Sequence, residues 1–200
     1  MSGEAAAAAA SRDPRLAQYL ALLERWNATY NLTAVRDPTQ METQHLADCL
    51  SVVEPLRREV NARPVRILDV GSGGGLPGVV LALSEPTWDV TCIDAVGKKA
   101  AFIRQVAAEL ALPNLHAVYG RVQDLQAPGF DVITARAFGS LGDLVEWTKP
   151  LLAPGGVWVA MKGRRPASEL DALPAGVMFH VEPLRVPDLD AERCLVWMKT

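Results

Sequence analysis

The sequence has few cysteines, and they are poorly placed to cross-link the chain or to hold a metal. Its 200 residues include three, Cys49, Cys92 and Cys194, which lie far apart. An odd number of widely spaced cysteines does not fit a disulfide framework, and none of the spacings is that of a metal site. We therefore expect reduced thiols, a cytoplasmic protein and no bound metal.

Long apolar runs and a secretory start are also missing. No apolar run approaches the roughly 18 residues that a membrane-spanning helix needs. The N-terminus, Met1-Ser2-Gly3-Glu4 followed by Ala5 to Ala10, lacks the basic start and the bulky apolar core of a signal peptide. We interpret residues 1–13 as a flexible arm and expect no membrane partner.

The chain also lacks the excess of positive charge that is typical of nucleic-acid binders, because its net charge is −3. The distribution of charge is uneven. Residues 98–165 contain nine Lys or Arg and five Asp or Glu, a net charge of +4, whereas the rest of the chain carries −7. Scattered solvated charge is the simpler interpretation. A local phosphate-binding rim is the alternative.

What is present is an orderly alternation of helical and strand patterns. Apolar residues at helical spacing predict a helix over 14–28, and Asp37-Pro38 predicts the start of a second helix over 38–58. We assign residues 14–60 to an N-terminal helical extension and residues 61–200 to the main domain. Strands are predicted at 65–70, 89–94, 115–119, 130–135, 156–162, 177–186 and 194–199. Further helices are predicted at 76–84, 97–111, 140–152 and 167–173.

This alternation predicts an α/β fold with a seven-stranded, mostly parallel sheet. No helix separates the last two strands, which residues 187–193 connect. We therefore expect that the last strand pair is antiparallel.

The most informative segment joins a strand to a helix through a glycine-rich turn. The apolar run Val65 to Val70 predicts a buried parallel strand, and five of the eight residues from Gly71 to Gly78 are glycine. Asp94 ends the next strand, 23 residues after Gly71, where an acid would meet ribose hydroxyls. This combination is typical of the first strand, turn and helix of a nucleotide-cofactor fold. A purely structural turn, and a helix-capping role for Asp94, are the alternatives.

Three features favour S-adenosylmethionine over a nicotinamide dinucleotide. Asp69 could face the ammonium group of a methionine moiety, but it would repel a pyrophosphate. Pro77 stands where a helix would otherwise offer an N–H to phosphate. Residues Leu151 to Gly156 lead into an apolar strand and a terminal hairpin, and the combination resembles class I methyltransferases. An NAD(P)-dependent oxidoreductase and a non-catalytic RNA-binding module on the same fold are the alternative functions.

The chain lacks two devices that activate difficult methyl acceptors. No cysteine stands at the end of the fourth strand or after the fifth to attack an aromatic ring, and Cys92 is expected in the core. Where an Asn/Asp-Pro-Pro-aromatic motif would hold an exocyclic amine, the sequence has Thr134 to Phe138. A ring nitrogen with a free lone pair, such as guanine N7, needs neither device.

From about residue 16 to its end the chain resembles the RsmG (glucose-inhibited division protein B) family. The motifs that carry the resemblance occur in order and at matching spacing. They are Trp26-Asn27, Tyr30 to Pro38, His45-Leu46-x-Asp48, Leu68 to Gly78, Asp94-x-x-Gly97-Lys98-Lys99, Gly120-Arg121-Val122, Arg136-Ala137-Phe138-x-Ser140-Leu141 and Lys162-Gly163. The resemblance implies a bacterial enzyme that uses S-adenosylmethionine to make 7-methylguanosine in the 530 loop of 16S rRNA. Residues 61–200 would be its methyltransferase domain.

The resemblance also implies residue roles. Asp69, Gly71, Gly73 and Leu76 would lie against S-adenosylmethionine. Asp94 would hold the ribose, and Val122 and Gln123 would flank the adenine. Arg136 would lie beside the cofactor and the entering base and is the candidate catalytic residue. The candidates for contact with RNA phosphates are Lys98, Lys99, Arg121, Lys162, Arg164 and Arg165. Taken singly, each of these six is more often a solvated surface charge.

Several positions keep two interpretations or depart from the family pattern. His45 and Asp48 could meet RNA or pack helices, and Trp26 and Tyr30 could stack on bases or lie in the core. Many relatives carry Glu in place of Gln123 and Arg in place of Gln44. We expect the substrate to be the small ribosomal subunit, because the net negative charge disfavours tight binding to naked RNA. We also expect a monomer.

Overall fold

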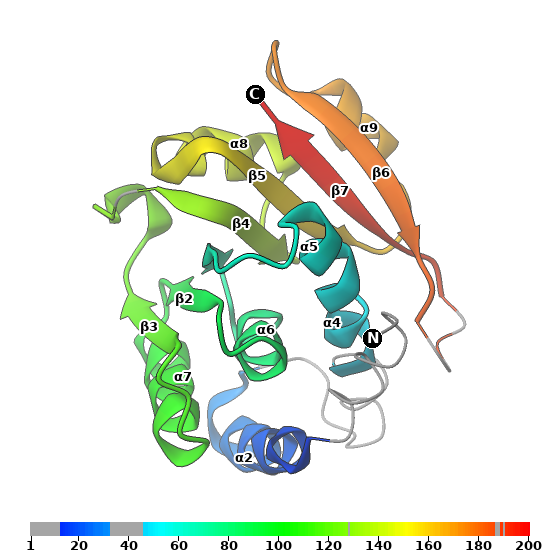
Figure 1. Ribbon diagram of the computed structural model, residues 1–200. Helices are drawn as coiled ribbons and strands as arrows, with labels where there is room; N and C mark the ends of the chain where they lie inside the picture. The colour runs from blue at the N-terminus through cyan, green and yellow to red at the C-terminus, as the bar shows by residue number, and fades with distance from the viewer. Residues whose placement is uncertain (1–12, 33–45, 128, 187–188, 190) are drawn as a thin grey trace.

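The computed structural model describes residues 13–32, 46–127, 129–186, 189 and 191–200. These residues form an α/β protein around one seven-stranded sheet with the strand order β3-β2-β1-β4-β5-β7-β6 (Figure 1). The strands are β1 (Arg66–Val70), β2 (Asp89–Asp94), β3 (Leu115–Tyr119), β4 (Phe130–Arg136), β5 (Leu152–Lys162), β6 (Met178–Leu184) and β7 (Arg193–Lys199). Strands β1 to β5 pair in parallel, and β7 is antiparallel to both β5 and β6. The predicted fold class and the antiparallel last pair are confirmed.

Helices cover both faces of this sheet (Figure 1). The helices are α2 (Pro14–Tyr30), α4 (Asp48–Leu50), α5 (Val53–Glu59), α6 (Gly78–Ser84), α7 (Gly97–Glu109), α8 (Leu141–Thr148) and α9 (Ala167–Asp171), with 3-10 turns η2 (Val122–Asp124) and η3 (Lys149–Leu151). Their starts follow local chemistry. The Asp13 side chain caps α2 just before Pro14, and Ser140 and Asp143 form a capping box at the start of α8.

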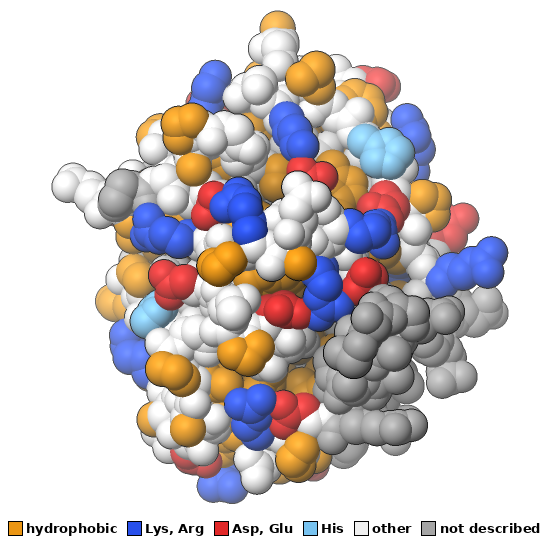
Figure 2. All heavy atoms as spheres, viewed as in Figure 1, with side chains coloured by type: hydrophobic (Ala, Val, Ile, Leu, Met, Phe, Trp, Pro, Cys, Tyr) orange, Lys and Arg blue, Asp and Glu red, His pale blue; other side chains and the backbone are white. Residues whose placement is uncertain are grey.

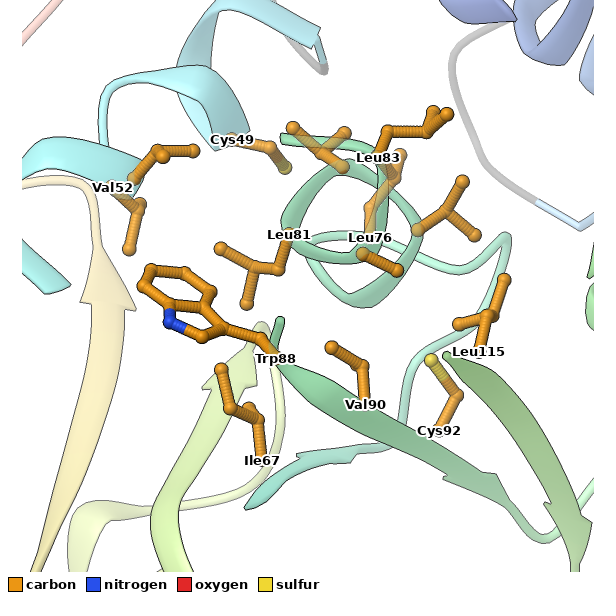
Figure 3. Packing of buried hydrophobic residues seen from close by; sticks show 14 of the residues in the cluster. Cys49, Val52, Ile67, Leu76, Leu81, Leu83, Trp88, Val90, Cys92 and Leu115 are labelled. Atoms are coloured by element: carbon orange, nitrogen blue, oxygen red, sulfur yellow. The ribbon is translucent and has the colours of Figure 1, made fainter. Parts of the chain in front are cut away.

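The pleat of the strands sends successive side chains to two separate cores. In β1, Ile67 belongs to the core under α2, α4, α5, α6 and α7, whereas Leu68 belongs to the core under α8 and α9. Figure 3 shows the first core, where Ile67 and Val90 point toward Leu81 of α6 and Val52 lies beside Trp88. Helices of the N-terminal segment therefore share a core with the sheet.

The predicted helix over 38–58 is not continuous where the structure describes it. Its residues 38–45 lie outside the described part, and the remainder divides at Ser51-Val52 into α4 and α5. Pro55 explains the break, because proline has no N–H for the carbonyl of Ser51 and its ring clashes with that carbonyl. At the break, the Ser51 side-chain hydroxyl donates to the carbonyl of Asp48 at 2.6 Å.

The predicted helix over 140–152 was too long, and the start of the fifth strand was placed too late. Helix α8 ends at Thr148, η3 follows, and β5 begins at Leu152. Pro150 removes the N–H that would continue the helix. The pairing between β4 and β5 shifts register between Phe130 and Val132, which accommodates the early start. The other predicted elements are confirmed to within a few residues at each end.

Every described helix is too short or too polar to cross a lipid bilayer.

Candidate cofactor and substrate site

Two adjoining cavities lie where the parallel strands end. They share Gly71 and have volumes of about 610 Å³ and about 180 Å³. The strand order reverses between β1 and β4 at this edge, which is where open α/β sheets bind their ligands. The larger cavity extends to the end of β5 and the start of β7, and the smaller one reaches the loop after β3.

The glycine-rich turn forms the wall between the two cavities. Gly71 and Gly73 have φ of +68° and +58°, a region that favours glycine. A Cβ on Gly71 would lie 2.7 Å from the Phe138 ring, so no larger residue fits there. Helix α2 supports the turn from behind, because the buried Tyr19 hydroxyl donates to the carbonyl of Gly74 at 2.6 Å.

Asp94 is level with this turn and is almost fully buried. Its carboxylate accepts hydrogen bonds from the backbone N–H groups of Gly73 (3.0 Å) and Val96 (2.8 Å). The ammonium group of Lys99 lies 3.7 Å from the same carboxylate. Asp94 therefore joins the glycine turn to the start of α7 and also lines the smaller cavity. The N-cap residue of α7 is Val96 itself, and no side chain among the described residues caps this helix, so Asp94 does not act as the cap that the alternative predicted.

The smaller cavity is mainly apolar. Ile93, Val122, Phe138 and Trp147 line it together with Gln123. The rings of Phe138 and Trp147 meet edge to face, with their centroids 5.8 Å apart. A flat aromatic ligand would find ring and aliphatic surfaces here, with polar groups at the margin.

Asp69 is near the cavities but lines neither of them. It is fully buried beneath α6, where one carboxylate oxygen accepts the N–H of Gly78 at 3.0 Å. The other oxygen has no hydrogen-bond partner among the described residues. Burial raises the pKa of Asp69 to about 6. Because Asp69 takes the Gly78 N–H, that group is not offered to a phosphate.

Arg136 ends β4 at the larger cavity, and Asp48 from α4 reaches it from the N-terminal segment. The Asp48 carboxylate lies 3.7 Å from Nη1 of Arg136 and accepts a hydrogen bond from Nε of Arg193 at 3.1 Å. Burial raises the pKa of Asp48, although both arginines oppose that shift. Ala137 follows at φ +55°, a strained conformation for a residue with a side chain.

The structure separates the predicted RNA-binding residues into three groups. Lys99 and Lys162 line the larger cavity, and Arg121 lines the smaller one. Lys162 is held by Glu169 of α9 at 2.8 Å. Lys98, Arg164 and Arg165 are exposed and line neither cavity. On the face in Figure 2, charges of both signs are interspersed.

The other predicted positions fall as follows. Gly71, Gly73, Leu76 and Arg136 line the larger cavity, and Asp94, Val122 and Gln123 line the smaller one. His45 and Gln44 lie outside the described residues. Trp26 packs on Phe102, with ring centroids 5.4 Å apart, whereas the Tyr30 side chain is exposed.

The sequence interpretation missed Arg193 at the larger cavity and left the role of Asp48 open. Arg193 follows a polar connection, so its spacing gives no signal of a site. The alternation of apolar and polar side chains along β7 could have shown on which face of the sheet Arg193 lies.

An elongated ligand with an apolar ring at one end and charged groups at the other fits the two cavities. Glycine at position 71 lets the turn pack closely against the Phe138 ring, where a Cβ would clash, and so places this ring beside the smaller cavity. Asp94 and the aromatic pair lie at one end, and Arg136 and Arg193 line the other. S-adenosylmethionine has this distribution of groups. Among the described residues, no group of three or more His, Cys, Asp or Glu side chains could hold a metal ion.

Solved structures share this architecture. TrmN from Thermus thermophilus is 26% identical with a TM-score of 0.59, over 76% of this chain and 49% of TrmN. The plantazolicin methyltransferase BpumL, in complex with SAH, has a TM-score of 0.63 at 14% identity, over 91% of this chain and 95% of BpumL, and so supports the fold alone. The fold and the site are those of a class I S-adenosylmethionine-dependent methyltransferase.

Sequence comparison narrows this class to one family. The model of the GidB family, rRNA small subunit methyltransferase G, matches residues 12–196. The ribosomal RNA small subunit methyltransferase G of Leptothrix cholodnii is 61% identical over 92% of this chain and 85% of that protein. That of Methylibium petroleiphilum is 57% identical over 94% and 86%. The chain belongs to the rRNA small subunit methyltransferase G family.

Proposed function

We propose that this protein transfers a methyl group from S-adenosylmethionine to N7 of a guanine in the 530 loop of 16S rRNA. The observation that carries the proposal is the pair of joined cavities at the strand ends, in a chain of this family. The smaller cavity suits an adenine, and the larger one has room for an amino-acid moiety and an entering base. The relatives are named for methylation of small-subunit rRNA.

The residues would hold the cofactor as follows. Asp94, which is level with the turn, would accept hydrogen bonds from the ribose hydroxyls. Val122 would pack on the adenine ring, and the backbone at Gln123 would form hydrogen bonds with the edge of that ring. Gly71, Gly73 and Leu76 lie along the methionine moiety, and Asp69 stabilises the turn from beneath through Gly78. Bound S-adenosylmethionine supplies a methyl group on a positively charged sulfur.

Guanine N7 carries a free lone pair and no proton, so the acceptor does not need a general base. Positioning then supplies much of the catalysis. Arg136 is placed to orient the base at the end of β4, because its side chain lines the larger cavity and is mostly buried. An arginine remains protonated at neutral pH and can donate to acceptor atoms on a guanine edge.

The substrate extends beyond one base, and the basic residues at the strand ends are placed to meet its phosphates. Lys98, Lys99, Arg121, Lys162, Arg164 and Arg165 are the candidates. The net charge of −3 favours an assembled or partly assembled small subunit over naked rRNA. We further propose that the protein acts as a monomer in the cytoplasm.

The test is methyl transfer from labelled S-adenosylmethionine to small subunits that lack the modification, followed by nucleoside mass spectrometry. We expect 7-methylguanosine that maps to the 530 loop. Cofactor binding is measured in parallel by calorimetry. Binding without incorporation, or a methylated product other than 7-methylguanosine, would overturn the proposed substrate.

We predict that Arg136→Ala leaves cofactor binding within about threefold of wild type but lowers transfer by at least about 100-fold, since orientation of the base is lost. The matched control is Arg63→Ala, which removes an exposed arginine that pairs with Asp131 at the opposite edge of the sheet. Turnover on small subunits and thermal unfolding are compared for both variants. Unchanged turnover in Arg136→Ala contradicts the assignment.

A further inference from the structure

One carboxylate from the N-terminal segment lies between two arginines that come from distant parts of the chain. Asp48 accepts from Nε of Arg193 at 3.1 Å and lies 3.7 Å from Arg136. The Asp48 side chain is 8% exposed, and those of Arg136 and Arg193 are 19% and 22% exposed. All three residues line the larger cavity.

The pleat of the sheet explains this cluster. Val132 and Leu195 belong to the core under the N-terminal helices, and Arg136 and Arg193 stand an even number of residues from them. Both arginines therefore lie on the face that α4 covers. Lys162 alternates with Met161 and falls on the other face, where it meets Glu169 of α9.

The charges in this part of the cavity are unequal among the described residues. Lys99 has Asp94 as a partner, and Lys162 has Glu169. Asp48 is the described carboxylate that accepts from Arg193, and it also lies 3.7 Å from Arg136. Partly buried cations gain strongly from a further anionic ligand, because water screens them poorly.

The position of the cluster indicates which ligand supplies that anion. The cavities that suit the cofactor follow β1, β2 and the loop after β3. Arg193 lies at the start of β7, which is two strands beyond β4 in the sheet, roughly 10 Å away at the usual strand spacing. This end of the larger cavity extends past the cofactor half, toward the space where the RNA must enter.

We infer that Arg193 binds a phosphodiester of the RNA next to the target nucleotide and that Asp48 is a positioning residue which aims both Arg193 and Arg136 into the cavity. The inference rests on the proposed function, since it names the substrate contact of that site. Arginine suits this contact because its planar group binds two phosphate oxygens at once. Asp48 fixes the Nε side of Arg193, and Nη1 donates to the carbonyl of Glu192 at 2.8 Å. The second N–H of Nη1 and the N–H groups of Nη2 are then left to the ligand.

The experiment measures methylation of small subunits over a range of salt concentrations, with cofactor affinity measured separately by calorimetry. Arg193→Ala is expected to raise KM about tenfold, to leave the cofactor Kd within about twofold, and to reduce the slope of log KM against log salt by about 0.7 to 1. Arg193→Lys keeps the charge and should recover most of the slope but only part of KM. A matched control is Arg58→Ala, which removes an exposed arginine bonded to Glu182.

Asp48 is tested through its conservative variants. Asp48→Asn keeps the shape and loses the charge, and it is expected to raise KM and lower kcat about tenfold without weakening cofactor binding. Asp48→Glu restores the carboxylate and should recover part of both. If Asp48→Asn proves unstable in thermal unfolding, the Arg193 variants decide the inference.

The outcomes are distinguishable. If the wild-type protein does not methylate small subunits, the proposed function itself is overturned. An active wild type with an unchanged salt slope in Arg193→Ala overturns the phosphate contact. A weakened cofactor Kd in Arg193→Ala, with KM for subunits unchanged, assigns the anion to the cofactor's carboxylate and overturns the inference. Equal losses in Asp48→Asn and Asp48→Glu contradict the positioning role of the carboxylate.

Discussion

At the scale of single residues, Asp69 and Asp94 show how position along a strand decides what a carboxylate can do. In the pairing of β1 with β2, Asp69 is opposite Cys92, so Asp94 stands two residues further along, level with the glycine turn. Asp94 therefore reaches the cavity, whereas Asp69 remains under α6 and bonds to Gly78. The contact of Asp69 with a methionine ammonium group stays a prediction.

The buried Asp69 should make stability depend on pH. Its pKa is about 6 in the folded protein, against an ordinary pKa of 3.8 for an aspartate, so the folded state binds more protons between those values. The free energy of unfolding therefore falls as pH rises through this window, by up to about 3 kcal/mol from this group. The asparagine of Asp69→Asn cannot ionise, so this variant does not lose that free energy of unfolding. We expect urea unfolding to show that Asp69→Asn gains stability relative to wild type between pH 4 and 7.5.

A difference between the two proteins that stays constant with pH would contradict the raised pKa of Asp69. The same variant tests the sequence prediction independently. If Asp69 meets the ammonium group of the cofactor, Asp69→Asn also weakens cofactor binding at pH 7.5, which calorimetry would detect.

Removal of the Asp94 carboxylate is expected to weaken cofactor binding strongly. Asp94→Ala removes the proposed ribose contact and also the two bonds that hold the turn to the start of α7. Hydrogen bonds to charged groups contribute about 1.5–3 kcal/mol each, so the cofactor Kd should rise about tenfold to 100-fold. Asp89→Ala, at the opposite end of β2, is the control in the same calorimetric titration. An affinity equal to wild type would refute the ribose role.

At the scale of elements, α2 is part of the site although it contributes no cavity residue of its own. Tyr19 bonds to the carbonyl of Gly74, and a Cβ on Gly74 would lie 2.8 Å from the Leu23 side chain. The helix and the turn therefore restrict each other. A helix that packs on a cofactor loop can transmit changes in the N-terminal segment to cofactor affinity.

We predict that Tyr19→Phe lowers the free energy of unfolding by about 1 kcal/mol, because the buried carbonyl of Gly74 loses its partner. It should also weaken cofactor binding several-fold, since the turn is less constrained. Tyr30→Phe, which changes an exposed ring on the same helix, is the control. Urea unfolding and calorimetry measure the two effects. Stability and affinity both at wild-type values would show that the bond is dispensable.

At the scale of the whole molecule, the N-terminal helices and the sheet form one core. The first apolar cluster runs from Leu16 in α2 through Leu56 in α5 to Trp197 in β7. Figure 1 shows α4 and α5 lying in front of the sheet on the same side as α6. Residues 14–60 are an extension in sequence, but in space they cover one face of the sheet.

The whole chain should therefore unfold in one cooperative transition. We expect tryptophan fluorescence and far-UV circular dichroism to give coincident urea curves, because Trp26 in α2 and Trp158 in β5 lose their packing together. A fragment of residues 61–200 should fail to reach a native near-UV spectrum, since the core face under α2, α4 and α5 would be exposed. Two separated transitions, or a folded fragment that binds cofactor, would show an independent domain.

Local patterns determined much of this molecule. The apolar run before Gly71, the glycines after it and the alternating periodicities are short-range features, and they predicted the strand, the turn, the parallel sheet and the terminal hairpin. The spacing after Gly71 suggested the ribose role of Asp94, whereas the roles of Gly71 and Arg136 came from the family resemblance. The structure places all three residues at the cavities. Apolar periodicity alone predicts continuous helices through Pro55 and Pro150, but each proline removes a backbone N–H and breaks the helix.

The tertiary structure decided which side chains meet. Asp48 and Arg193 are 145 residues apart in sequence, so only the packing of α4 on the sheet brings them together. The packing of α9 on the opposite face ties Lys162 to Glu169, and the packing of α6 covers Asp69. The physical reason is that sequence patterns report a residue's periodicity and chemistry. Its partner depends on strand order, register and the helix that covers each face.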